Sequence, residues 1–372
     1  MSNYENVISY AKPHTIKKFE LIEKYVMTWS QKLLQNPKCN RIVFIDCMCN
    51  SGEYVNDETK QRIFGTPIRV AKILHNCSYQ YKEKEIDLYF NDIEEDKVNH
   101  LKEILVEQKL SPHKNFQLQF AHIDKSDFLK QTFLKLKKNG THFLLLYDPY
   151  DASIDWDSLQ PYFDSWGEVI INHMVSDSLR ALPNIQTDSA KQKYENTYGH
   201  QIRELLQYQD REAFEQCVEE LIKKYRKQNK EHPYRIAAFP FFNKRNSIVY
   251  YLIHCTPSIA GFKLYKKTAW QVFQGHSSTK NRHGKDSQFI FDFENGLTST
   301  EIDKNCYSVR DIAAYIQKKF CGKSEVPRKD VWESLEKHPV FPSDGFCPQI
   351  CDILKREYTA NVSKQSITFR EK

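Results

Sequence analysis

The chain has 372 residues, of which 40% are hydrophobic and 27% charged, with 54 Lys and Arg against 48 Asp and Glu. This length predicts two or three domains, and the composition excludes a mainly disordered chain. The opening residues contain no apolar run, and no stretch of about 18 apolar residues follows, so we expect neither a signal peptide nor a membrane span. Ten scattered cysteines without a Cys-x-x-Cys pair predict no metal site and free thiols in a reducing cytoplasm. The net charge of +6 permits nucleic acid binding without requiring it.

The first half of the chain alternates between helical and extended patterns. Residues 15–35 carry apolar side chains at helical spacing and predict an amphipathic leader helix within segment 1–40. Helices are also expected at 67–76, with Thr66 as its cap, and at 94–109. Short apolar runs between them predict buried parallel strands at 41–46, 87–91, 116–123, 142–147 and 169–172.

The second half closes the sheet and adds a further domain. After a helical insertion near 189–230, segments 235–242 and 247–255 are joined by four residues and must be antiparallel strands. Five parallel strands closed by an antiparallel hairpin are the sheet pattern of class I methyltransferases. We therefore predict an α/β, Rossmann-like doubly wound sheet of about seven strands over 41–275.

The remaining segments are expected to be a helix at 259–273, a basic loop and linker at 276–308 with one more strand at 289–293, and helices near 309–320, 327–337 and 346–357. Three helices followed by a polar hairpin predict a winged-helix-like domain at 309–372.

Acidic residues lie at the ends of four predicted strands. Ligands of doubly wound sheets bind beyond the carboxyl ends of the strands, so Asp46, Asp92, Asp124 and Asp148 are candidate site residues. We interpret Asp92 as the acceptor of two ribose hydroxyls of an adenosine, and Asp124 as a contact to its adenine. Each aspartate alone is equally well an exposed turn or cap residue. The loop CMCNSGEY has only one glycine, Gly52, where a loop that binds S-adenosylmethionine usually has several.

Asp148-Pro149-Tyr150 resembles the Asp-Pro-Pro-Tyr motif of amino-methyltransferases acting on nucleic acid bases, with one proline missing. In that motif the acidic side chain binds the target amino group and the ring stacks on the flipped base. Asn172, after the fifth strand, is the fourth candidate catalytic residue. Alternatively, Pro149 ends the strand and Tyr150 packs beneath the next helix. The basic stretch 263–285 is either a phosphate contact or a solvated face.

The order of these motifs resembles the three-Cys-motif partner protein (TcmP) family over residues 12–275. The resemblance rests on the following features: His14, Lys17, Tyr25 and Trp29 in the leader helix, Phe44-Ile45-Asp46, Gly65-Thr66-Pro67, Asp148-Pro149, Asn172, and 249–253 before a helix ending in Trp270. It implies a methyltransferase-like fold and a partnership with a three-cysteine, radical-SAM-like protein. The family's turn after the first aspartate is richer in Gly and Ala than the one found here.

Three functions follow as hypotheses. The first is an S-adenosylmethionine-dependent methyltransferase that acts on an amino group of a nucleic acid. The second is a catalytically weak or inactive module of the same fold that binds nucleic acid or the three-cysteine partner. The third, a nuclease or hydrolase, would need a metal held by the clustered aspartates.

Overall fold

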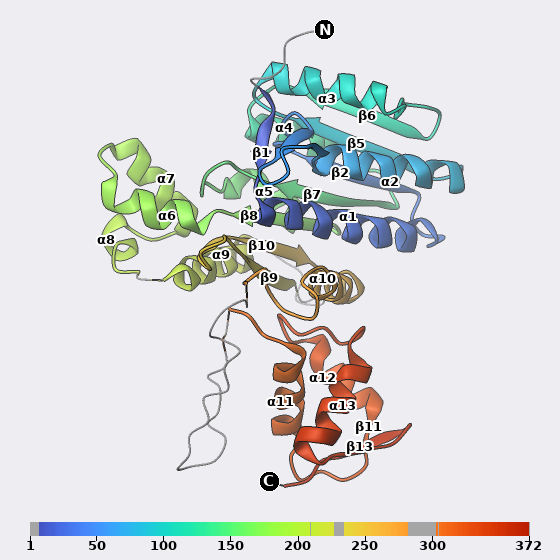
Figure 1. Ribbon diagram of the computed structural model, residues 1–372. Coiled ribbons are helices and arrows are strands. Elements are labelled where there is room, and N and C mark those ends of the chain that lie inside the picture. The colour runs from blue at the N-terminus through green and yellow to red at the C-terminus, as the bar shows by residue number, and fades with distance from the viewer. Residues whose placement is uncertain (1–6, 209, 227–233, 282–302, 304, 372) are drawn as a thin grey trace.

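The computed structural model describes residues 7–208, 210–226, 234–281, 303 and 305–371 (Figure 1). Its centre is a seven-stranded sheet with the strand order β6-β5-β2-β7-β8-β10-β9. The strands are β2 (Arg41–Asp46), β5 (Glu85–Asn91), β6 (Phe116–Ala121), β7 (Thr141–Tyr147), β8 (Glu168–His173), β9 (Arg235–Phe242) and β10 (Ile248–Thr256). The first five are parallel, and β10 runs antiparallel to both β8 and β9. The predicted Rossmann-like sheet with its closing hairpin is confirmed.

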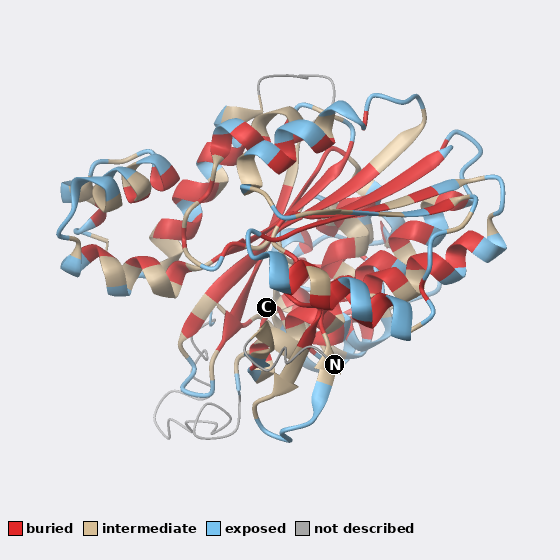
Figure 2. Ribbon diagram, turned by 90° about the horizontal axis from the view of Figure 1, so that it is seen from above, coloured by how far each residue is buried: buried red, intermediate tan, exposed pale blue. Residues whose placement is uncertain are grey.

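Helices cover both faces of this sheet, and the strands are buried between them (Figure 2). One face carries α1 (Pro13–Leu34), α2 (Thr66–Gln80), α3 (Glu95–Glu107) and α10 (Ile259–Val272), and the other carries α4 (Lys125–Leu134), α5 (Trp156–Phe163) and α9 (Arg211–Tyr225). Side chains of a strand point alternately to opposite faces. In β2, Ile42 and Phe44 therefore belong to the first core, and Val43 and Ile45 to the second.

A small second sheet covers the first loop of the fold. It consists of β1 (Ser9–Ala11), β3 (Glu53–Asn56) and β4 (Arg62–Phe64). β1 pairs in parallel with β3, and β3 forms a hairpin with β4. Strands this short carry too few residues to show a period of two, so none of the three was predicted from the sequence.

The C-terminal residues form a separate group of elements docked on α10 (Figure 1). They are α11 (Val309–Phe320), α12 (Arg328–Glu336) and α13 (Cys347–Tyr358), with an antiparallel sheet of β11 (Val326–Pro327), β13 (Ser366–Thr368) and β12 (Asn361–Val362). The Trp270 indole of α10 donates a hydrogen bond to the Val340 carbonyl at 2.9 Å. The buried ammonium of Lys266 donates to three carbonyls at the end of α12 and just after it, at 2.6 to 3.1 Å.

Several local predictions were wrong. Gly65, not Thr66, is the N-cap of α2, and no side chain caps this helix. β6 ends at Ala121, two residues early, because the Asn91 side chain takes over both backbone groups of Ile123 at 3.0 and 3.1 Å.

The helical insertion is also not continuous. After α6 (Val175–Ala181) and the 3-10 turn Leu182–Asn184 come α7 (Asp188–Tyr198), α8 (Ile202–Leu205) and α9. Gly199 ends α7 in a left-handed conformation with φ of 69°. The strand expected at 289–293 lies outside the described residues. Within the described part of the chain, no helix combines the length and apolar character that a membrane crossing needs.

Candidate functional site

Three of the four predicted aspartates come together at the carboxyl edge of the sheet. Asp46 is the last residue of β2, Asp92 follows β5 and Asp148 follows β7. Asp46 and Asp92 are only 2% and 1% exposed. Asp124 differs, because it is exposed and its carboxylate caps α4 by accepting the Ser126 backbone N–H at 2.8 Å. The cap alternative therefore describes its geometry, and a contact to adenine stays a prediction.

The first loop turns tightly despite its single glycine. Asn50 and Gly52 both have positive φ, at 58° and 75°. Asparagine tolerates this conformation better than most residues, so it replaces a glycine here. A Cβ on Gly52 would lie 2.6 Å from Leu101 Cδ1, so this position also needs glycine for space. The scarcity of glycine thus does not prevent the turn.

The carboxylate of Asp92 is fully engaged by its surroundings. Its Oδ2 accepts the Asn50 backbone N–H at 3.0 Å and the Tyr150 hydroxyl at 3.2 Å, and its Oδ1 accepts the Glu94 N–H at 3.1 Å. Lys97 donates to the Tyr150 hydroxyl at 3.1 Å and lies 4.8 Å from the centre of its ring. Tyr150 is 59% exposed. The alternative in which it packs beneath the next helix is wrong, since it instead lies over Asp92.

Asp148 is held by two side chains from distant parts of the chain. Lys18 of α1 forms an ion pair with its Oδ2, and the Asn172 amide donates to its Oδ1 at 2.5 Å. The Asn172 Oδ1 is buried and has no hydrogen-bond partner among the described residues. Lys18 was not among the candidate site residues predicted from the sequence. Its sole sequence signal is a lysine on the apolar face of an amphipathic helix, and this side chain is 8% exposed.

Tyr54 of β3 is a second residue that the sequence analysis missed. Burial, followed by the charges of Asp148 and Asp46, raises the pKa of its hydroxyl well above the usual value. Its hydroxyl is therefore near enough to the carboxylate cluster to feel the charges of the aspartates. A Cβ at Gly65 would come within 2.4 Å of the Tyr54 ring, so this ring position depends on a glycine at 65.

The cluster carries more negative charge than its buried setting favours. Burial, then the charge of Asp148 and more weakly that of Asp92, raises the pKa of Asp46 well above its usual value, although Lys18 opposes this. Its one hydrogen bond among the described residues is long, from the Met48 backbone N–H at 3.4 Å. A buried carboxylate with a single long hydrogen bond is destabilising, and a cationic ligand would offset this cost.

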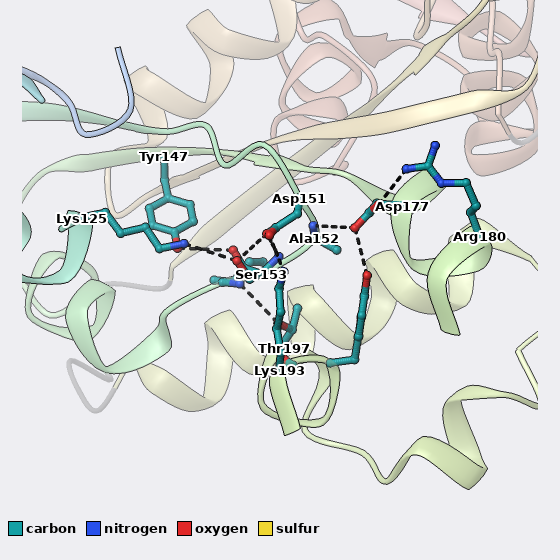
Figure 3. Close-up of polar contacts among 11 residues, drawn as sticks. Lys125, Tyr147, Asp151, Ala152, Ser153, Asp177, Arg180, Lys193 and Thr197 are labelled. Carbon is teal, nitrogen blue, oxygen red and sulfur yellow. Dashed lines mark hydrogen bonds and ion pairs between the residues drawn. The ribbon is translucent and has the colours of Figure 1, made fainter. Parts of the chain in front are cut away.

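The segment after Tyr150 is fastened to the helical insertion (Figure 3). Asp151 pairs with Lys193 of α7 and accepts the Ser153 backbone N–H at 2.8 Å. Although burial acts in the opposite direction, the Lys193 and Ser153 donors lower the pKa of Asp151. Asp177 of α6 accepts the Ala152 N–H at 3.4 Å. The insertion thus fixes the loop that carries Pro149 and Tyr150.

The basic stretch 263–285, expected to be either a phosphate contact or a solvated face, has a structural role over its first part. Lys263 and Lys267 of α10 pair with Glu336 and Asp344 of the C-terminal elements, and Lys266 is buried beneath them. Residues 282–285 lie outside the described part of the chain. Among the described residues, no three His, Cys, Asp or Glu side chains are placed to hold a metal ion.

Comparison with known proteins gives weak likenesses only. No family model matches the chain, and no curated protein matches it. Among solved structures, a Legionella pneumophila protein of family DUF519 is 12% identical, with a TM-score of 0.39 over 68% of this chain and 92% of its own. A SAM-dependent methyltransferase of Methanosarcina mazei is 9% identical, with a TM-score of 0.28 over 59% of this chain and 93% of its own. At such identities and TM-scores, none of these likenesses assigns an activity, and the resemblance to the TcmP family stays a prediction.

Proposed function

We propose that this protein is an S-adenosylmethionine-dependent methyltransferase whose cofactor site is the carboxyl edge of the sheet. The observation that carries the proposal is the cluster of Asp46, Asp92 and Asp148 at the edge where Rossmann-like sheets bind ligands. S-adenosylmethionine brings a sulfonium, an ammonium and a ribose diol. The cations would offset the excess charge around Asp46, and the diol would bind Asp92.

The chain's residues fit this cofactor in charge but not in access. Asp92 is 1% exposed, and the Tyr150 hydroxyl occupies its Oδ2. A diol therefore reaches the carboxylate only if Tyr150 turns away. This movement is a side-chain rotation at the surface, since Tyr150 is 59% exposed. The freed ring would then be available to stack on an acceptor base, the role expected in the Asp-Pro-Pro-Tyr motif.

For the acceptor we propose an amino group on a nucleic acid. The supporting observation is Asn172 Oδ1, a buried hydrogen-bond acceptor beside Asp148 that has no partner among the described residues. An amino group has two N–H donors, and Asn172 with Asp148 offers two oxygens that would orient it. Lys18 holds the Asp148 side chain in place. The cofactor would supply the methyl group, so the protein's task is alignment and exclusion of water.

Titration calorimetry with S-adenosylmethionine and S-adenosylhomocysteine tests the cofactor. We expect both to bind, and Asp92→Ala to weaken binding about 10- to 100-fold, because hydrogen bonds to a charged group contribute about 1.5–3 kcal/mol. Asp127→Ala, which removes an exposed carboxylate from the first turn of α4, is the matched control and should bind like the wild type. Absence of heat in the wild type, or equal affinity in both variants, would refute the proposal.

A second candidate is a binding module with an enzyme's outline. The Tyr150 hydroxyl occupies Asp92 Oδ2, which favours this second candidate. The module would bind nucleic acid through the C-terminal elements, which we propose as a winged-helix-like reader, or it would bind a three-cysteine, radical-SAM-like protein. Tyr150→Ala separates the two candidates, since it exposes Asp92. A protein that binds neither compound even with this substitution supports the module.

A further inference from the structure

The carboxyl edge continues beyond the cluster into a cavity of about 420 Å³. This volume is within the range of small-molecule sites, roughly 300–1,000 Å³. The cavity lies between the first turn of α1, the turn that joins β9 to β10, and the segment that follows α10. Because β9 is parallel to β8, Phe242 at the end of β9 lies at the same edge as the aspartates. The cofactor proposed above does not use this cavity.

The lining of the cavity is positively charged. Among the described residues, the lining includes Lys17, Lys244 and Lys280 and no Asp or Glu. Each lysine pairs with a carboxylate from outside the lining. Lys17 lies 2.7 Å from Glu20, Lys244 lies 2.9 Å from Glu58, and Lys280 lies 2.6 Å from Asp303. Such solvent-accessible pairs contribute only about 0–1 kcal/mol, so an incoming anion can compete with them. The buried rings of Phe242 and Phe273 add an apolar wall.

The start of α1 adds donors to this lining. The helix has 22 residues, and it begins without a side-chain cap and without an acidic residue in its first turn. Its positive end is therefore not neutralised by its own sequence.

A second observation at the same place is His14, which lines the cavity and is 9% exposed. Its ring has no hydrogen bond among the described residues, and its one ring contact there is to Tyr250, at 5.8 Å. Burial, together with Lys12 and Lys18, lowers the pKa of His14 to about 4, so its neutral ring offers one donor and one acceptor. The buried His14 ring lines a basic cavity and has no hydrogen bond among the described residues, which indicates a polar ligand.

The cavity adjoins the proposed acceptor site through Tyr250. His14 and Lys18 lie one turn apart on α1, and Lys18 Nζ lies 5.6 Å from the centre of the Tyr250 ring while it pairs with Asp148. The Tyr250 hydroxyl donates to the His14 carbonyl at 2.9 Å. The first two turns of α1 therefore contribute residues to both the cavity and the proposed acceptor site.

We propose that this cavity binds a nucleoside phosphate, with the phosphate at Lys17, Lys244 and the start of α1, and the nucleoside against Phe242 and Phe273. This rests on the proposed function in one respect, since it places a nucleotide that neighbours the methyl-accepting one next to the proposed acceptor site. The nucleoside phosphate could come from two sources, a free nucleotide or one nucleotide of a nucleic acid strand.

The test is calorimetry with uridine 5′-monophosphate, inorganic phosphate and uridine, and fluorescence anisotropy with a labelled single-stranded oligouridylate. We expect uridine monophosphate to bind more tightly than phosphate or uridine alone. Lys17→Ala and Lys244→Ala should each weaken it about tenfold, since a charge-assisted hydrogen bond is lost. Lys138→Ala, at the opposite edge of the sheet where Lys138 pairs with Glu85, is the charge-matched control and should have no effect.

The outcomes separate the sources and the two proposals. Oligouridylate that binds more tightly than the monophosphate, with the same loss in both variants, identifies a strand as the source, and equal affinity identifies a free nucleotide. If Asp92→Ala leaves the affinity for uridine monophosphate unchanged, the nucleotide is not binding in the proposed cofactor site. If no probe binds, or if all three lysine variants behave alike, the proposal is wrong even where S-adenosylmethionine binds.

Discussion

The two edges of the central sheet differ in how well their buried carboxylates are supplied with hydrogen-bond donors. At the amino edge, Glu168 at the start of β8 accepts the Tyr25 hydroxyl and lies 2.7 Å from His254 Nε2. At the same edge, Arg41 donates to Asp87 at 2.7 Å. Each of these carboxylates has its own donors. At the carboxyl edge, Asp92 and Asp148 also have donors, but Asp46 has only one long hydrogen bond among the described residues, from the Met48 backbone N–H at 3.4 Å.

This difference distinguishes a stabilising network from a binding site. A buried carboxylate that is matched by donors holds elements together, and here it ties α1 to β8 and β10. A buried carboxylate with too few donors, such as Asp46, weakens the folded state, and proteins retain such groups where a ligand completes them. The amino edge should therefore govern stability, and the carboxyl edge should govern binding.

Glu168→Ala should have the largest effect, because it removes the acceptor common to Tyr25 and His254 in the interior. We expect a loss of about 3 kcal/mol in the free energy of unfolding, typical of breaking a buried network from one side. Urea denaturation followed by circular dichroism measures it, with Tyr25→Phe as a milder control. Affinity for S-adenosylmethionine should not change. A variant with wild-type stability, or with a selective loss of binding, would contradict the division between the edges.

Asp46→Asn should act in the opposite direction, and its effect should depend on pH. The pKa of Asp46 is raised in the folded state, so the wild type loses stability as pH rises from the unfolded value through the folded one. The variant lacks this loss. It should match the wild type near pH 4 and become more stable above it, by about 1 kcal/mol at neutral pH.

The measurement is the unfolding midpoint of both proteins across a pH series. S-adenosylmethionine binding should weaken in the variant, since the amide cannot neutralise a cation. A difference in stability that stays constant across the series would mean that Asp46 does not titrate as its burial implies.

The amino acid sequence predicted the fold well because the strands of a parallel sheet are continuous apolar runs. The predicted bounds of β2 at 41–46 and of β9 at 235–242 agree with the structure to the residue. The same reasoning put Asp46, Asp92 and Asp148 at one edge, since parallel strands place their carboxyl ends together.

What the sequence did not predict depends on contacts between distant segments. Lys18 reads as one of many helical lysines until α1 is laid beside Asp148, 130 residues later. Tyr54 belongs to a strand of four residues whose partner β1 lies near the N-terminus. The excess of charge was likewise invisible, because an aspartate's burial and its neighbours exist only in the folded chain. Local sequence patterns therefore predicted the cluster of aspartates but not the residues that surround it.

Tyr150→Phe should have the smallest effect, and it tests how the carboxyl edge opens. The substitution removes the hydroxyl 3.2 Å from Asp92 Oδ2 but keeps the ring over Lys97. Because one neutral hydrogen bond to the carboxylate is lost, the ribose diol competes with one donor fewer. We expect affinity for S-adenosylmethionine to rise roughly two- to fivefold, equivalent to about 0.5–1 kcal/mol. Calorimetry measures the affinity, and stability should change little because Tyr150 is largely exposed. Weaker binding in Tyr150→Phe would mean that the hydroxyl itself binds the cofactor, and Tyr150 would then be part of the cofactor site instead of its gate.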